Sequence, residues 1–276
     1  MLRECLDRRD REAHLGTLDT GRYRCRYVVW GRGPAIVLIP GLASDALSFT
    51  MLLARLQTSM RCVSYDLPAG IDDAAIVNHY RHEDLADDLF RLLDHLKINT
   101  CILYGFSFGS TIALRAMTQQ PGRISRAILQ GGFAHRSLSR AEAFVASWGR
   151  FLPGRLHQVP FFERLMAYNQ REPFLAREPE VWQFFLERQG HTPIRAFASR
   201  VLMIDRLDLR PLLPGIQTPT LLVSGDRDPS VESRCREELQ QGLPKVAHAE
   251  IESCGHQAHL THPEVLCEAI RHFLSQ

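Results

Sequence analysis

Short, predominantly apolar runs recur along this chain and alternate with segments of helical period. The clearest runs cover residues 35–39, 100–104 and 220–224. Runs of this kind are typical of strands that are buried on both faces of a sheet. Because the segments between them have the apolar spacing of helices, the pattern predicts an α/β fold in which helices cover both faces of a mostly parallel sheet.

The remaining elements follow from periodicity and from turn residues. Further strands are predicted at 23–30, 61–65, 126–130 and 246–251, and helices at 48–57, 81–96 and 111–120. A last helix is predicted to begin at Thr261, with Glu264 completing a capping box.

Composition excludes several classes of protein. Of the 276 residues, 45% are hydrophobic and 23% are charged, which is ordinary for a globular chain and excludes a disordered chain, a collagen-like fibre and a coiled-coil rod. The formal net charge is 33 − 31 = +2, too small to indicate a nucleic-acid-binding surface. The longest apolar stretch, 35–43, is far shorter than the roughly 18 residues of a membrane span, so none is predicted.

The N-terminus and the cysteines indicate a cytoplasmic protein. The first residues, MLRECLDRRDRE, carry charges of both signs where a signal peptide has an apolar core. The seven cysteines include no C-x-x-C pair, so neither a disulfide framework nor a zinc site is expected. The sequence does not indicate whether the chain is a monomer or an oligomer.

One region interrupts the alternation of strands and helices. Residues 133–213 contain no convincing buried strand and hold 12 of the 23 aromatic residues, with 12 arginines against 8 acidic residues. Prolines break its helical segments at 153, 160, 173, 179 and 193. We therefore predict a catalytic core formed by 1–132 and 214–276, with 133–213 inserted as a helical cap.

The segment Gly105-Phe106-Ser107-Phe108-Gly109 has the pattern G-x-S-x-G. It directly follows the predicted strand at 100–104 and precedes the predicted helix at 111–120. This strand–turn–helix setting is the one that a nucleophile elbow requires, because only glycine fits the crowded positions on either side of the serine. Ser107 is therefore predicted to be a nucleophile.

At this point the chain resembles the α/β-hydrolase family. The resemblance covers nearly the whole length through GFSFG, the IPGLAS loop, DLPAG at 66–70, LLVSGDRD and SCGHQAHLTHPE. It implies an eight-stranded, mostly parallel sheet, with the cap inserted after the sixth strand. No cofactor is implied.

The resemblance also implies partners for the serine, whose hydroxyl is a weak nucleophile without a base. The family places the base where His256 stands and the acid three residues after Gly225, at Asp228. Asp226 competes for the acid role but is expected to bond the turn. His259 and His262 extend a run of histidines that we interpret as loop and helix-start residues rather than as metal ligands.

An oxyanion hole requires two N–H donors directed at the developing negative charge. These are expected from the backbones of Phe108 and Leu42. The segment Pro40-Gly41-Leu42 has proline where many relatives have histidine, but the donor is a main-chain amide. The chain also lacks the HGGG form of many lipases and esterases, which argues against bulky tertiary-alcohol esters.

These residues together predict acyl transfer on a small-molecule ester. Four aromatic residues of the predicted cap are expected to line an apolar substrate pocket: Phe133, Phe144, Trp148 and Phe161. The same residues could serve thioester or lactone hydrolysis, acyl transfer, carbon–carbon bond hydrolysis or cofactor-free perhydrolysis. A binding or signalling protein on the same fold is a further alternative, because a fold does not fix a function.

Overall fold

The apolar runs form a single sheet in the computed structural model, which describes residues 1–69, 80–170, 172–174 and 179–276. The sheet has eight strands in the order β1-β2-β4-β3-β5-β6-β7-β8. Strand β2 pairs antiparallel with both β1 and β4, and all other neighbours are parallel. The strands are β1 (His14–Asp19), β2 (Arg24–Trp30), β3 (Ala35–Ile39), β4 (Arg61–Tyr65), β5 (Cys101–Phe106), β6 (Ile124–Gln130), β7 (Thr220–Gly225) and β8 (Val246–Ile251).

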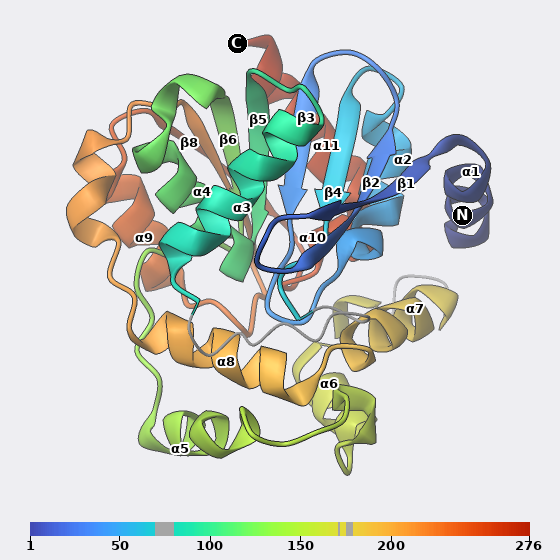
Figure 1. Cartoon of the computed structure of the whole chain (residues 1–276), viewed down its shortest axis with the longest axis vertical. Coiled ribbons are helices and arrows are strands. Elements are labelled where there is room, and N and C mark those ends of the chain that lie inside the picture. The colour runs from blue at the N-terminus through green and yellow to red at the C-terminus, as the bar shows by residue number, and fades with distance from the viewer. Residues whose placement is uncertain (70–79, 171, 175–178) are drawn as a thin grey trace.

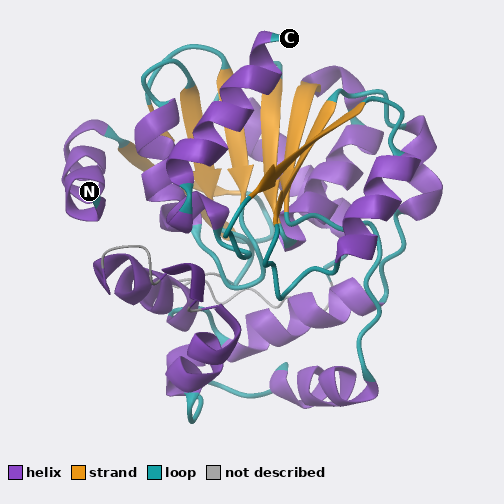
Figure 2. Cartoon of the chain, turned by 180° about the vertical axis from the view of Figure 1, so that it is seen from behind, coloured by secondary structure: helices purple, strands orange, loops and turns teal. Residues whose placement is uncertain are grey.

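Helices lie on both faces of the sheet and beyond one of its ends (Figure 1, Figure 2). The α-helices are α1 (Leu2–Glu12), α2 (Thr50–Leu56), α3 (His82–His95), α4 (Phe108–Gln119), α5 (Arg140–Gly149), α6 (Phe162–Gln170), α7 (Pro179–Gly190), α8 (Ile194–Asp205), α9 (Ser233–Gly242), α10 (Ala258–Thr261) and α11 (Pro263–Ser275). Short 3-10 helices are η1 (Ala46–Phe49), η3 (Pro121–Arg123), η4 (Leu156–Gln158), η5 (Glu172–Phe174) and η6 (Arg210–Gly215).

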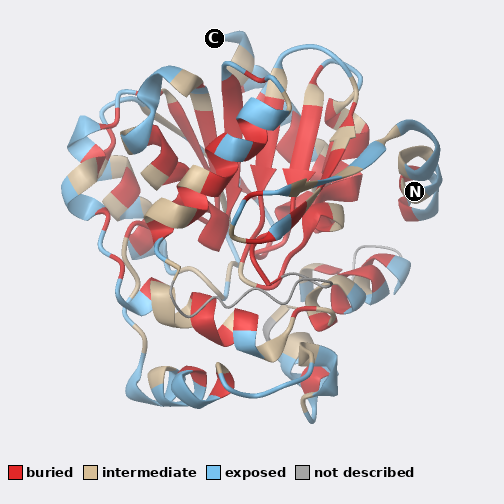
Figure 3. Cartoon of the chain, in the orientation of Figure 1, coloured by how far each residue is buried: buried red, intermediate tan, exposed pale blue. Residues whose placement is uncertain are grey.

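Strand β3 shows why the central runs are apolar throughout. Val37 and Ile39 lie in the hydrophobic cluster covered by α3 and α4, whereas Ile36 and Leu38 lie in the cluster covered by α2 and α11. Successive side chains of a strand point to opposite faces, so a strand with helices on both sides needs apolar residues at every position. Figure 3 shows the buried strands between the two layers of helices. The predicted fold class is confirmed.

The parallel strands end at the same edge of the sheet, so the loops that follow them meet there. Helices α5 to α8 lie between β6 and β7 in the chain and gather beyond one end of the sheet (Figure 1). An isolated bridge between His135 and Asp208 joins the beginning and the end of this segment. Phe133 and Leu213, at its predicted boundaries, lie in the main hydrophobic cluster. The division into core and cap at these residues stays a prediction.

Some local predictions were wrong or incomplete. Thr261 does not cap the last helix: it belongs to α10, and its hydroxyl donates to the Gln257 carbonyl. Helix α11 begins at Pro263 instead, because proline needs no N–H partner in the first turn. The elements α1, β1 and α9 were not predicted. Gly70, the last residue of the DLPAG motif, lies outside the described residues.

Within the described residues, none of the helices combines the length and the apolar character that crossing a bilayer requires. All seven cysteines are buried and free.

Candidate active site

Ser107 stands at the sharp turn between β5 and α4. Its backbone has φ +52° and ψ −117°, a conformation that a residue with a side chain seldom adopts and that costs about 1–3 kcal/mol. The Ser107 N–H donates to the Gln130 carbonyl at the end of β6 (2.9 Å). The turn is therefore fixed from the neighbouring strand.

The glycines on either side of Ser107 are required by close contacts. A Cβ atom at Gly105 would lie 2.7 Å from the Ser110 Cα, and one at Gly109 would lie 2.2 Å from the Ile39 carbonyl oxygen. Backbone atoms cannot move aside as the end of a flexible side chain can. This crowding is the physical basis of the G-x-S-x-G pattern in this chain.

His256 and Asp228 are joined by a hydrogen bond of 2.7 Å between Nδ1 and Oδ2, and their side chains are 7% and 8% exposed. The other carboxylate oxygen of Asp228 accepts from the N–H groups of Ser230 (2.8 Å) and Val231 (3.2 Å). Burial by itself raises the pKa of Asp228, but His256 and the two backbone donors outweigh it and leave the pKa below its ordinary value. Asp228 is thus held as a carboxylate facing the imidazole.

Among the described residues, no hydrogen bond or ion pair joins Asp226, the competing acid, to a histidine. Its Oδ1 accepts a hydrogen bond from the Cys254 N–H (3.0 Å) and so ties the turn after β7 to the loop that carries His256. Both aspartates therefore accept backbone hydrogen bonds, but it is Asp228 whose carboxylate also bonds to the imidazole.

Ser107 follows β5 and His256 lies in the loop after β8, so both stand at the same edge of the sheet. The His256 ring packs against the Phe106 ring, next in sequence to the serine, at a centroid distance of 4.9 Å. Within the described residues, no hydrogen bond joins Ser107 Oγ to His256. In unliganded enzymes such bonds are often long and shorten only when the substrate is bound.

Gln130 bonds to both the serine and the histidine segments. In addition to its carbonyl bond with Ser107 N–H, its side-chain amide donates to the His256 carbonyl (2.8 Å) and its amide oxygen accepts from the Tyr104 hydroxyl. The side chain is almost fully buried. Sequence reasoning missed this residue, because nothing in the local pattern distinguishes it from an ordinary strand end.

Replacing Gln130 by leucine is expected to lower kcat for ester hydrolysis about 10- to 100-fold with little change in KM, because His256 loses its backbone anchor while the substrate contacts remain. Steady-state kinetics below the unfolding temperature would measure this. Gln119→Leu, an exposed glutamine at the end of α4, is the matched control. A kcat equal to that of the control would show that Gln130 does not position the histidine.

The two predicted oxyanion donors lie in suitable elements. Phe108 is the first residue of α4, where N–H groups have no partner within the helix. Leu42 follows β3 in a loop that lies against the serine: a Cβ atom at Gly41 would be 3.5 Å from the Ser107 Cβ.

A buried arginine from α8 holds this loop in place. The guanidinium of Arg200 donates to the carbonyl of Leu42 (2.5 Å) and to the carbonyl of Pro68 (2.8 Å). Burial lowers the pKa of Arg200 to about 10, so it stays charged at neutral pH. Sequence reasoning missed Arg200 as well, since its partners are backbone atoms far away in the sequence.

The sequence profile of the α/β hydrolase fold family matches residues 34–263, which is most of the chain. The protein belongs to the α/β-hydrolase family. The putative carbamate hydrolase RutD of Pantoea ananatis is 26% identical, over 83% of this chain and 84% of its own. The 3-oxoadipate enol-lactonase 1 of Acinetobacter baylyi is 24% identical, over 87% and 88% of the two chains.

Solved structures show the same fold. A thermophilic esterase from Thermogutta terrifontis superposes with a TM-score of 0.83 at 23% identity, covering 95% of this α/β-hydrolase and 98% of its own chain. The enol-lactonase of Burkholderia xenovorans has a TM-score of 0.81 at 24% identity, covering 95% and 100%. At these identities the likeness concerns the fold alone.

The four aromatic residues predicted to line a substrate pocket lie in different surroundings in this α/β-hydrolase. Phe133 is 2% exposed and belongs to the main hydrophobic cluster, whereas Phe144 and Trp148 are 64% exposed and Phe161 is 71% exposed. Three of the four therefore point largely to solvent. Their role in substrate binding stays a prediction.

His259 is buried three residues beyond His256. Its ring packs on Phe49 and Phe106, with centroid distances of 5.0 and 4.6 Å. Neither ring nitrogen has a hydrogen-bond partner within the described residues. Burial, assisted by the neighbouring His256, lowers the pKa of His259 to about 3. The residue therefore serves this α/β-hydrolase as a neutral aromatic group.

The low pKa of His259 predicts a dependence of stability on pH. In the unfolded chain the imidazole takes up a proton near its usual pKa of 6.5, whereas the folded protein keeps it neutral down to about pH 3. The free energy of unfolding therefore decreases as the pH falls below 6.5, by about 2 kcal/mol between pH 7 and pH 5. Urea unfolding should show that His259→Phe loses about that much less than the wild type over this interval. Equal losses in both proteins would contradict the assignment.

Proposed function

We propose that the protein is a serine hydrolase that cleaves carboxylic esters of small, largely apolar molecules through an acyl-enzyme on Ser107. The observation that carries the proposal is the 2.7 Å hydrogen bond between His256 and Asp228, beside an elbow that holds Ser107 at positive φ. A base that is oriented by an acid, next to a strained serine, is the arrangement that activates a hydroxyl.

The proposed first step is acylation. His256 Nδ1–H donates to Asp228, which leaves Nε2 to accept the proton as Ser107 Oγ attacks the ester carbonyl carbon. The carbonyl oxygen becomes an oxyanion that accepts from the N–H groups of Leu42 and Phe108. When the tetrahedral intermediate collapses, the C–O bond to the alcohol breaks and the alcohol oxygen takes the proton from His256.

Deacylation repeats these steps with water in place of the serine hydroxyl. His256 Nε2 accepts a proton from the water, the water oxygen attacks the acyl carbon, and the same two amides hold the second oxyanion. The bond to Ser107 Oγ then breaks, the serine recovers its proton from His256, and the acid is released. Every step uses side chains and amides of this chain. In this proposal, residues 133–213 act as the cap over the site.

Lactone hydrolysis is the second candidate. It is favoured by the similarity to two proteins named as enol-lactonases, and a lactone is a cyclic ester that the same residues would open. The chemistry of acylation is unchanged; only the leaving alcohol stays attached to the acyl group. The two functions therefore differ in the shape of the substrate rather than in the catalytic residues.

A panel of substrates tests the proposal. Initial rates of the wild type on p-nitrophenyl esters of increasing acyl length are compared with rates on a lactone and a thioester of similar size, with Ser107→Ala as the blank. We expect the highest kcat/KM on a short or medium ester. A preference for the lactone would select the second candidate, and no turnover of any of these substrates would contradict both.

A further inference from the structure

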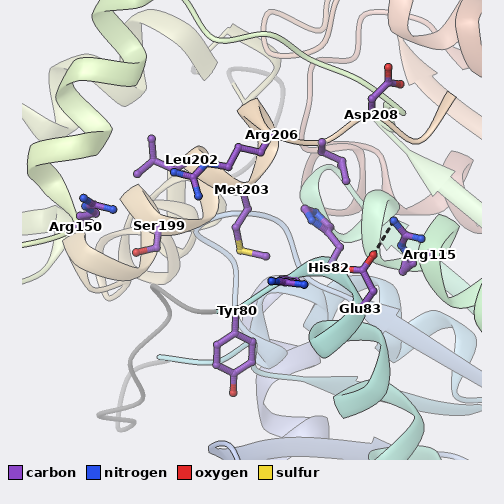
Figure 4. A pocket seen from close by; sticks show the side chains of 12 residues that line it. Tyr80, His82, Glu83, Arg115, Arg150, Ser199, Leu202, Met203, Arg206 and Asp208 are labelled. Carbon is purple, nitrogen blue, oxygen red and sulfur yellow. Dashed lines mark ion pairs between the residues drawn. The ribbon is translucent and has the colours of Figure 1, made fainter. Parts of the chain in front are cut away.

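A cavity of about 340 Å³ lies between the beginning of α3, the middle of α4 and the end of α8 (Figure 4). Four arginines contribute to its wall: Arg81, Arg115, Arg150 and Arg206. They come from segments that are far apart in the sequence. The fold therefore concentrates positive charge at this place.

The acidic residues of the cavity pair with one of these four arginines and, among the described residues, leave the other three without a carboxylate partner. Glu83 pairs with Arg115 at 2.8 Å, as the dashed line in Figure 4 marks. Asp208 is engaged by Arg210, which is not part of the wall, at 2.8 and 2.9 Å. Among the described residues, no carboxylate forms an ion pair with Arg81, Arg150 or Arg206.

Two guanidinium N–H groups lack acceptors. The Nε atoms of Arg115 and Arg150 are buried without a hydrogen-bond partner in the part of the chain that the structure describes. A buried donor without an acceptor is costly, and a charged donor more so. The Arg150 guanidinium also stacks on the Phe151 ring at 4.6 Å, which restricts its orientation. An anion entering the cavity would supply acceptors that the described residues do not.

The rest of the wall is apolar or uncharged. Leu202, Met203 and Leu207 form its apolar part. His82 does not add to the positive charge: burial lowers its pKa to about 4, and its Nε2 is bonded to the Thr111 hydroxyl at 3.0 Å. The cavity thus combines guanidinium groups with an aliphatic surface.

We propose that this cavity binds an organic anion, a carboxylate or phosphate monoester attached to an apolar body. The guanidinium groups of Arg150 and Arg206 hold the anionic oxygens, and the body lies on the aliphatic wall. Arg115 follows Ser107 by 115 − 107 = 8 residues on α4, about 12 Å along the helix. The site is therefore separate from the elbow, and the anion is either the far end of a long substrate or an independent molecule.

Isothermal titration at fixed ionic strength tests the binding, with octanoate and octyl phosphate as probes and 1-octanol as the neutral probe. We expect both anions, but not octanol, to bind the wild type and Ser107→Ala alike. The double substitution Arg150→Gln/Arg206→Gln should weaken anion binding at least about tenfold. Arg195→Gln removes an exposed charge from α8 at a position outside the cavity and should leave binding unchanged. Failure of both anions to bind, or equal affinity in the double variant, would overturn the proposal.

A variant that is expected to bind the anion more tightly excludes misfolding as the cause of weaker binding. Glu83→Gln removes the carboxylate that occupies Arg115 and is expected to tighten octanoate binding several-fold. Loss of folding cannot produce tighter binding. An affinity equal to or weaker than that of the wild type would count against the site.

Kinetics then distinguish the two sources of the anion. If it belongs to the substrate, an ester with a terminal carboxylate is preferred over the neutral ester of equal length, and the double variant loses that preference. If it is an independent molecule, added octanoate changes kcat or KM for a neutral ester in the wild type only. The titration with Ser107→Ala does not depend on the proposed hydrolytic function, so failure of one leaves the other open to test.

Discussion

Replacing Ser107 by alanine is expected to lower kcat for p-nitrophenyl esters by about 10⁴- to 10⁶-fold, the largest effect of any single substitution in this chain. The reason is that the proposed reaction proceeds through a covalent bond to Oγ, and alanine has no atom that can replace it. Rates with the purified variant, compared with those of the wild type and of buffer alone, would measure the loss.

A second serine provides the control for this experiment. Ser125 lies in β6 near its beginning, where its hydroxyl donates to the Cys101 carbonyl at 3.1 Å. Ser125→Ala removes the same atom at a position remote from the carboxyl end of that strand and should retain wild-type kcat. If Ser107→Ala kept the activity of Ser125→Ala, the nucleophile would be another group and the proposed mechanism would be wrong.

Replacing Asp228 by asparagine is expected to lower kcat about 10⁴-fold. The amide keeps the size of the side chain but cannot stabilise a positively charged His256. It can also present its NH₂ group to Nδ1, which would place the imidazole proton on Nε2, the atom that must accept the serine proton. KM should change much less than kcat, because both Asp228 oxygens are already bonded, one to His256 and the other to backbone N–H groups.

Asp226→Asn is the matched control, two residues away on the same turn. Its Oδ1 accepts a backbone hydrogen bond, which the asparagine oxygen can also accept. We expect kcat within about threefold of the wild type. If Asp226→Asn and Asp228→Asn lowered kcat equally, neither would act through the imidazole, and the loss would reflect the integrity of the turn.

The sequence was most informative where a local pattern has a single physical cause. The run at 35–39 coincides with β3, because a strand covered on both faces has no position for a polar residue. Gly105 and Gly109 could be assigned to an elbow because their surroundings admit no Cβ atom. In each case the constraint acts within a few residues of the chain, so a reader of the sequence can recognise it.

The features that were missed depend on partners distant in sequence. Gln130 and Arg200 are polar residues whose bonds to His256 and Leu42 exist only once the chain has folded.

Helix α1 was not predicted because charges of both signs surround its few buried residues. The exposure of Phe144 and Trp148 could not be predicted either, since aromatic residues are expected to be inside on average and composition does not say which of them are not.

The proposed mechanism requires Ser107 to carry the acyl group. Wild-type protein mixed briefly with p-nitrophenyl acetate, quenched in acid and digested, can be analysed by mass spectrometry for the acetylated peptide. We predict an acetyl group on Ser107, and its accumulation in His256→Ala only at a greatly reduced rate. Turnover of the ester with the acetyl group on another residue, or with no adduct and undiminished turnover in Ser107→Ala, would show that Ser107 is not the nucleophile.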